Sequence, residues 1–213
     1  TIRGDSNERS FLEKIPTMKT LRFLLLGIAA LACAAAVQAE PVTLSGVKYD
    51  DAADVRGARL QLNGAGVRYK AVFKVYAAGL YLPRKAGTTE EVLAMPGAKR
   101  MSVTMLREVD SSELGKLFSR GMEDNMDKSS FSKLVPGVMR MSQIFSEHKK
   151  LNAGETFLID WVPGTGTVVT VKGVVQGEPF KEPEFFNALL RIWLGPVPAD
   201  WKLKEALLGK PAA

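Results

Sequence analysis

Arg68 and Tyr76 are the residues whose types and spacing best suit a binding site. They lie eight positions apart in the stretch GAGVRYKAVFKVYAAGLYL, residues 64–82. Because strand side chains alternate between two faces, this even spacing places both residues on one face of a continuous strand. A guanidinium offers a planar fork of N–H donors that fits a carboxylate or an enolate oxygen. The pair is therefore a candidate anion site, and pairing of Arg68 with a nearby acidic residue is the structural alternative.

The other polar residues form no recognisable catalytic or metal-binding pattern. The single histidine, His148, lies beside two lysines at the predicted end of a helix, where a cationic side chain suits the helix dipole. One His and one Cys are too few for the usual zinc ligand sets. Gly64 and Gly66 do not extend into the dinucleotide-binding fingerprint. The sequence therefore predicts no metal and no cofactor.

The N-terminal region has the pattern of a secretory leader. Met18 is followed by two basic residues, an apolar run over residues 23–37 and the small-residue sequence Val37-Gln38-Ala39. This is the arrangement of a signal peptide that is cleaved before Glu40. The apolar run is short for a membrane span and is followed directly by polar residues.

Such a leader divides the chain into three parts. We expect residues 1–17 to lie upstream of the true start, residues 18–39 to be the signal peptide, and residues 40–213 to form one exported domain, periplasmic or secreted. Since Cys33 lies inside the leader, the mature domain has no cysteine and no disulfide. Cys33 also makes a poor lipidation site, because the residue three positions earlier is alanine. No stable membrane span is expected after cleavage.

Composition and charge give no specific support for a nucleic-acid partner. The chain is 46% hydrophobic and 24% charged, as in an ordinary globular protein. Its formal net charge is +6, but the lysines and arginines are scattered and form no basic run. Together with export, this argues against a nucleic-acid partner.

Strand patterns dominate the first half of the mature chain and return near its end. Residues 71–82 form the most strongly apolar stretch, and both of its alternating sets are apolar, so we expect both faces of this strand to be covered. The remaining patterns predict a hairpin over 41–50, a strand over 58–68 that runs into a Gly-rich turn, a strand over 98–109, and two or three strands over 155–180.

Helix signals fill the middle and the end of the chain. Asp110 begins a predicted capping box with Glu113, and Pro136 lies early in the helix that follows. The predicted helices cover 88–95, the segment from Asp110, 129–149, 183–195 and 198–209. This order of elements indicates an α+β domain with an antiparallel sheet and helices on one face.

The stretch around Arg68 resembles the chalcone isomerase superfamily, in particular its bacterial chalcone isomerase-like branch. GAGVR followed by FKVYAAGLYL is similar to the Gly-Gly-x-Gly-x-Arg turn and the Phe-x-Lys-Phe-Thr-x-x-Gly-Val-Tyr-Leu strand of the plant isomerases, and the order of later segments over 42–209 agrees. The resemblance implies an open-faced β-sandwich, in which a large antiparallel sheet is backed by a layer of helices with a ligand cleft between them.

The same resemblance implies roles for individual residues. Arg68 matches the arginine that holds the oxyanion in the true isomerases. The strand threonine of those enzymes matches Tyr76, and their helical tyrosine, asparagine and closing-helix serine or threonine fall on or near Leu114, Gly121 and Ile192. Each missing buried hydrogen bond costs about 1–3 kcal/mol of substrate positioning, so efficient chalcone cyclisation is not expected.

Three functions follow from this comparison. The first is a non-catalytic binder of a hydrophobic carboxylate such as a fatty acid, with Arg68 and Tyr76 holding the carboxylate as in the fatty-acid-binding plant branch. The second is an isomerase or intramolecular lyase that acts on a chalcone-like enone, with Arg68 stabilising the oxyanion. The third is an envelope protein-interaction module, which a salt-bridged Arg68 without a cavity behind it would favour.

Overall fold

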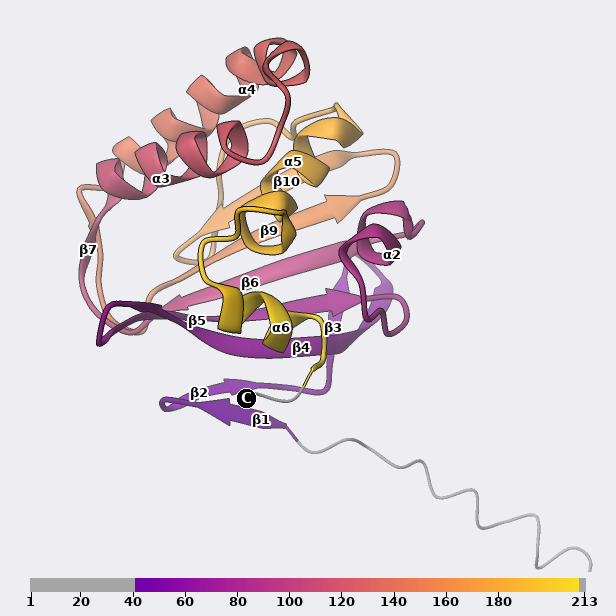
Figure 1. Ribbon diagram of the computed structural model, residues 1–213, viewed down its shortest axis with the longest axis vertical. Helices are drawn as coiled ribbons and strands as arrows, with labels where there is room; N and C mark the ends of the chain where they lie inside the picture. The colour runs from indigo at the N-terminus through magenta and orange to yellow at the C-terminus, as the bar shows by residue number, and fades with distance from the viewer. Residues whose placement is uncertain (1–40, 211–213) are drawn as a thin grey trace, which may run out of the picture. The chain divides into compact units, whose positions relative to one another are not determined.

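A seven-stranded antiparallel sheet organises residues 41–210, which are the residues that this computed structural model describes (Figure 1). The predicted leader and residues 1–17 lie outside the described residues. The strands of the sheet, in spatial order, are β11 (Val174–Val175), β10 (Gly166–Val171), β9 (Thr156–Val162), β6 (Lys99–Met105), β5 (Phe73–Leu82), β4 (Ala58–Lys70) and β3 (Ala52–Val55).

A layer of helices covers one face of this sheet, as Figure 1 shows. The helices are α2 (Thr89–Ala94), α3 (Ser111–Glu123), α4 (Lys128–Ser146), α5 (Pro183–Leu194) and α6 (Trp201–Leu207). α5 packs on β10, α6 packs on β4 and β5, and α3 packs between α4 and α5. The main hydrophobic core lies between this layer and the sheet. The predicted α+β architecture, a large antiparallel sheet backed by helices, is confirmed.

A small hairpin covers part of the opposite face of the sheet. β1 (Val42–Leu44) pairs with β2 (Val47–Tyr49), as predicted from the Ser45-Gly46 turn. Tyr49 belongs to a second apolar cluster that includes Ala77 and Tyr81 of β5. Both faces of β5 are therefore buried, and Gly79 lets the Tyr49 ring lie close, because a Cβ on Gly79 would be 2.6 Å from Tyr49 Cδ1.

The predicted Gly-rich turn at residues 64–66 is wrong, because β4 runs through these residues and the chain turns at residues 71–72. The glycines permit the close approach of α6. A Cβ on Gly64 would lie 2.0 Å from the carbonyl oxygen of Ala206, and one on Gly66 would lie 2.8 Å from Ala206 Cβ. Glycine inside a strand can mark such a close approach of another backbone and not only a bend.

One strand boundary and one helix cap also differ from the predictions. The predicted strand over 98–109 ends at Met105 and resumes as β7 (Val109–Asp110), which pairs with β8 (Lys150–Leu151). Asp110 caps α3 by accepting from the N–H groups of Ser112 and Glu113, whereas the Glu113 carboxylate pairs with Lys116.

None of the helices within residues 41–210 combines the length and apolar character that a bilayer crossing requires.

Gly64→Ala is expected to destabilise the protein by about 1–3 kcal/mol or more, because the added Cβ would overlap the Ala206 carbonyl of α6. Gly87→Ala is the matched control, since Gly87 is exposed and a Cβ there would meet no atom within 4 Å. Its effect should stay within about 0.5 kcal/mol. Urea unfolding measures both variants, and equal stability of the two would contradict the close packing of α6 on β4.

Candidate functional site

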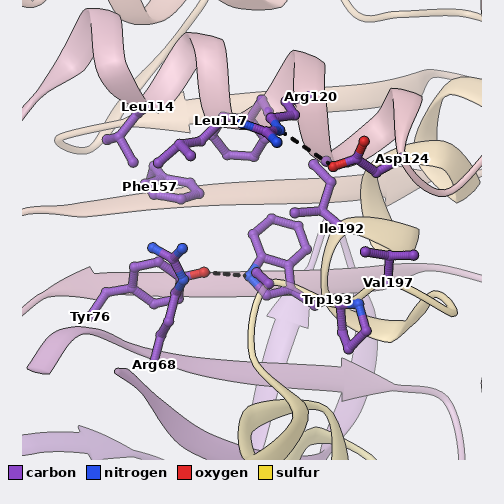
Figure 2. Close-up of a pocket in the computed structure, with 14 residues that line it drawn as sticks. Arg68, Tyr76, Leu114, Leu117, Arg120, Asp124, Phe157, Ile192, Trp193 and Val197 are labelled. Atoms are coloured by element: carbon purple, nitrogen blue, oxygen red, sulfur yellow. Dashed lines mark hydrogen bonds and ion pairs between the residues drawn. The ribbon is translucent and has the colours of Figure 1, made fainter. Parts of the chain in front are cut away.

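A cavity of about 240 Å³ lies between the sheet and the helix layer (Figure 2). Its lining comes from β4, β5, β9, α3, α5 and the segment that joins α5 to α6. Most of the lining is apolar, and its polar groups come from Arg68, Tyr76, Arg120 and Asp124. The site therefore combines a hydrophobic interior with a few polar groups, which is the usual composition of a small-molecule pocket.

Arg68 and Tyr76 do face the same side of the sheet, but the reason differs from the predicted one. They are not on one continuous strand, because Arg68 lies on β4 and Tyr76 on β5. The hairpin register places them directly opposite each other. Opposed residues of an antiparallel pair point to the same face. The Arg68 Cζ atom lies 5.5 Å from the centroid of the Tyr76 ring, so the guanidinium is within cation–π range of the phenol.

The Arg68 guanidinium has no acidic partner within residues 41–210. Its Nε atom is buried and makes no hydrogen bond. Asp200 lies nearby, but its carboxylate accepts from the backbone N–H groups of Tyr69, Lys202 and Leu203 at 2.9, 2.8 and 3.1 Å. A buried donor without a partner is costly, and an anion in the cavity would relieve that cost. Arg68 therefore forms no salt bridge within residues 41–210, which argues against the structural alternative.

Tyr76 is held by an indole on the opposite wall. Trp193 Nε1 donates to Tyr76 Oη at 2.8 Å, and both side chains are buried. Burial raises the pKa of Tyr76 from 10.0 to about 12, although the nearby Arg68 charge lowers it. The phenol is therefore neutral at physiological pH. Because its oxygen already accepts from Trp193, its own proton is available to donate to a ligand.

The positions that resemblance assigned to lost hydrogen-bonding groups line this same cavity. Leu114 and Gly121 come from α3, and Ile192 comes from α5. Gly121 lies close to Ile192, since a Cβ added to Gly121 would be 3.0 Å from Ile192 Cγ2. None of the three offers a hydroxyl or an amide side chain. The structure thus brings Arg68, Tyr76 and these positions together around one mainly apolar space.

Several lining residues were not predicted from the sequence. Trp193 and Phe157 form buried aromatic walls, and Arg120 pairs with Asp124 at 3.6 Å, with both side chains largely exposed (Figure 2). The one sequence signal for Trp193 is its place beside Ile192 on the closing helix. Only the fold brings these side chains to Arg68.

His148 is not part of the cavity. Its Nε2 atom lies 3.2 Å from Gln176 Oε1. Among residues 41–210, no three His, Cys, Asp or Glu side chains are grouped as metal ligands would be.

Tyr76→Phe is expected to cost about 1–3 kcal/mol, because it leaves the buried indole N–H of Trp193 without an acceptor. Tyr69→Phe is the matched control, since Tyr69 is exposed and its hydroxyl makes no hydrogen bond within the described residues. That control should change stability by less than about 0.5 kcal/mol. Urea unfolding followed by tryptophan emission tests both. A Tyr76→Phe variant with an unchanged free energy of unfolding would argue against the Trp193 contact.

Comparison with known proteins agrees with this geometry. A family model described as chalcone isomerase-like matches residues 41–209. The crystal structure of a fatty-acid binding protein from Arabidopsis thaliana is similar, with a TM-score of 0.62, 17% sequence identity, and coverage of 79% of this chain and 96% of that chain. At this identity, the likeness shows a shared fold. No match was found among the curated proteins compared by sequence. The chain belongs to the chalcone isomerase-like family.

Proposed function

We propose that this protein is a non-catalytic binder of a hydrophobic carboxylate, such as a fatty acid. The observation that carries the proposal is Arg68, which lines a mainly apolar cavity and whose buried Nε atom has no hydrogen-bond partner within residues 41–210. The similar Arabidopsis protein is named as a fatty-acid binding protein, which agrees with this function. The proposal itself rests on the chemistry of the cavity in this chain.

The proposed ligand is held at its two ends by different forces. Its carboxylate accepts from the Arg68 guanidinium and from the Tyr76 hydroxyl, and hydrogen bonds to charged groups contribute about 1.5–3 kcal/mol. Its apolar part packs among Leu114, Phe157 and Ile192, where each buried methylene contributes about 0.8 kcal/mol.

The size of the cavity limits the ligand that it encloses. Its volume of about 240 Å³ is below the range of about 300–1,000 Å³ that is common for pockets of drug-sized ligands. We therefore favour a short acyl chain or a single ring system inside the cavity, with any longer tail leaving through the mouth.

Catalysis on a chalcone-like enone is the less favoured alternative. Arg68 is suitably placed to stabilise an oxyanion, but Leu114, Gly121 and Ile192 cannot hydrogen-bond a polyphenol. A site built to orient a hydroxylated substrate needs such partners, because an unpaired polar group is costly when it is buried. The third alternative, a protein-interaction module, would be favoured by an Arg68 salt bridge without a cavity behind it, and neither is present within residues 41–210.

We also propose that the protein acts after export, in the periplasm or outside the cell. The support is the signal-peptide pattern of residues 18–39, with Glu40 as the mature N-terminus. An exported carboxylate binder would meet ligands that are released into the envelope.

Arg68→Ala is expected to weaken carboxylate binding by about 10- to 100-fold, because it removes a charge-assisted contact. Native mass spectrometry of protein purified from a bacterial periplasm should detect a co-purifying carboxylate in the original protein and lose it in the variant. The mass of the protein itself should correspond to a chain beginning at Glu40. Arg59→Ala is the matched control, since Arg59 is an exposed arginine on the same strand and does not line the cavity.

Titration with a fatty acid and with the alcohol of the same length isolates the charge. The acid should bind more tightly to the original protein, and the two ligands should bind alike to Arg68→Ala. Equal affinity of the original protein for the acid and the alcohol would contradict the proposed role of Arg68. Conversion of a chalcone by the original protein, lost in Arg68→Ala, would instead support the isomerase alternative.

A further inference from the structure

Exposed apolar side chains gather beside the cavity mouth. Val72 and Phe73, at the tip of the β4–β5 hairpin, are 82% and 59% exposed, and Trp201, at the start of α6, is 59% exposed. Tyr69 and Val197 are also exposed. Large apolar side chains that are exposed as a group mark a contact surface more often than single ones do.

Contacts tie these side chains to the elements that form the cavity. The hairpin that supplies Arg68 and Tyr76 continues directly into the tip at residues 69–74. The lining segment at 197–199 leads directly into Asp200, whose carboxylate accepts from the Tyr69 backbone N–H at 2.9 Å. The hairpin tip and the start of α6 are thus joined next to the cavity. In Figure 1 the tip lies at the left of the view, below the segment labelled β7.

The same surface carries unpaired positive charge. Lys70, Lys74, Arg107 and Lys202 are exposed, and none of them forms an ion pair within the described part of the chain. The Arg107 Cζ atom lies 5.2 Å from the Phe73 ring centroid, so this charge sits against the apolar tip.

Acidic groups near this surface are already engaged. No acidic residue occurs between positions 65 and 83. Asp200 caps α6, and Glu108 pairs with Lys150 at 2.7 Å. The four cations therefore outnumber Asp200, the neighbouring carboxylate that no lysine or arginine pairs with within residues 41–210, so the surface carries a net positive charge. We call the apolar residues Tyr69, Val72, Phe73, Val197 and Trp201, together with Lys70, Lys74, Arg107 and Lys202, the rim.

We propose that the rim docks onto an anionic lipid surface. Aromatic side chains favour the boundary between headgroups and acyl chains, and lysines and arginines favour anionic headgroups. A protein partner fits less well, because lysine is depleted in protein–protein interfaces whereas it makes up much of the rim. The inference goes beyond the proposed ligand binding, since docking requires no ligand. If the protein also binds a hydrophobic carboxylate, as proposed above, docking would place the cavity mouth next to a membrane from which that ligand is taken.

Vesicle flotation of the full chain tests the proposal. The protein should bind vesicles of phosphatidylglycerol mixed with phosphatidylcholine, and bind pure phosphatidylcholine much more weakly. The triple variant Lys70→Gln, Lys74→Gln, Lys202→Gln should lose affinity by about 100-fold, at roughly fivefold per charge. The double variant Val72→Ser, Phe73→Ser should lose at least about tenfold. The control Val174→Ser, Val175→Ser changes two adjacent apolar residues on β11, which are also exposed, and should bind as the original does.

A local readout separates docking by the rim from any contribution of residues 1–40. Trp201 is the one exposed tryptophan of three, so brominated lipids in the vesicles should quench its emission, and Trp201→Phe should remove that quenching. Vesicle binding without Trp201 quenching, or rim variants that bind like the original protein, would overturn the proposal. The proposal would also be overturned if the protein bound a partner protein but did not bind the vesicles.

Failure of the proposed function gives a different result. The rim variants should bind fatty acid in solution as the original protein does, because their residues do not line the cavity. If no form of the protein binds a carboxylate, the proposed function fails while vesicle docking is still measured independently.

Discussion

The packing of α6 against the bare backbone of β4 is the constraint on which the site depends. Gly64 and Gly66 leave no side chain between the strand and the helix, and α6 fills that space. This close approach brings Asp200 to the Tyr69 backbone, and it fixes the segment at 197–199 as one wall of the cavity. The position of the last helix therefore decides both where the cavity ends and which side chains surround its mouth.

Polar groups in and beside the cavity differ in how far their hydrogen bonds are satisfied, and the difference suits the proposed anionic ligand. Asp200, beside the cavity, has three N–H donors, and Tyr76 has the indole of Trp193, whereas the buried Nε of Arg68 has no hydrogen-bond partner within residues 41–210. Proteins that satisfy most of their buried polar groups often leave exceptions at functional sites. The guanidinium is such an exception, and its cation–π contact with the neutral Tyr76 ring leaves its charge without a counter-charge.

The apolar walls are the reason that we propose binding and not ring closure. The family's fold brings several positions together around Arg68, and the side chains at those positions determine the chemistry. In this chain Leu114, Gly121 and Ile192 make the surroundings of the guanidinium hydrophobic. Such a space stabilises an acyl chain or a ring by burial, but it supplies few directional contacts to hold a polyphenol in a reactive geometry.

The sequence by itself determined most of the elements and one candidate residue of the site, Arg68. Alternation, caps and turn residues are local properties, so they predicted the β1–β2 hairpin, the doubly buried β5, the helix that Asp110 caps and the α+β class. Arg68 was identified from its residue type and from family resemblance. Tertiary structure decided what depends on segments far apart in the chain. Residues 64–66 form a strand because α6 covers them, Tyr76 meets Arg68 across a hairpin, and Trp193 reaches Tyr76 from another helix. Local patterns carry no information about such close approaches, because the free energy that favours them comes from packing between elements.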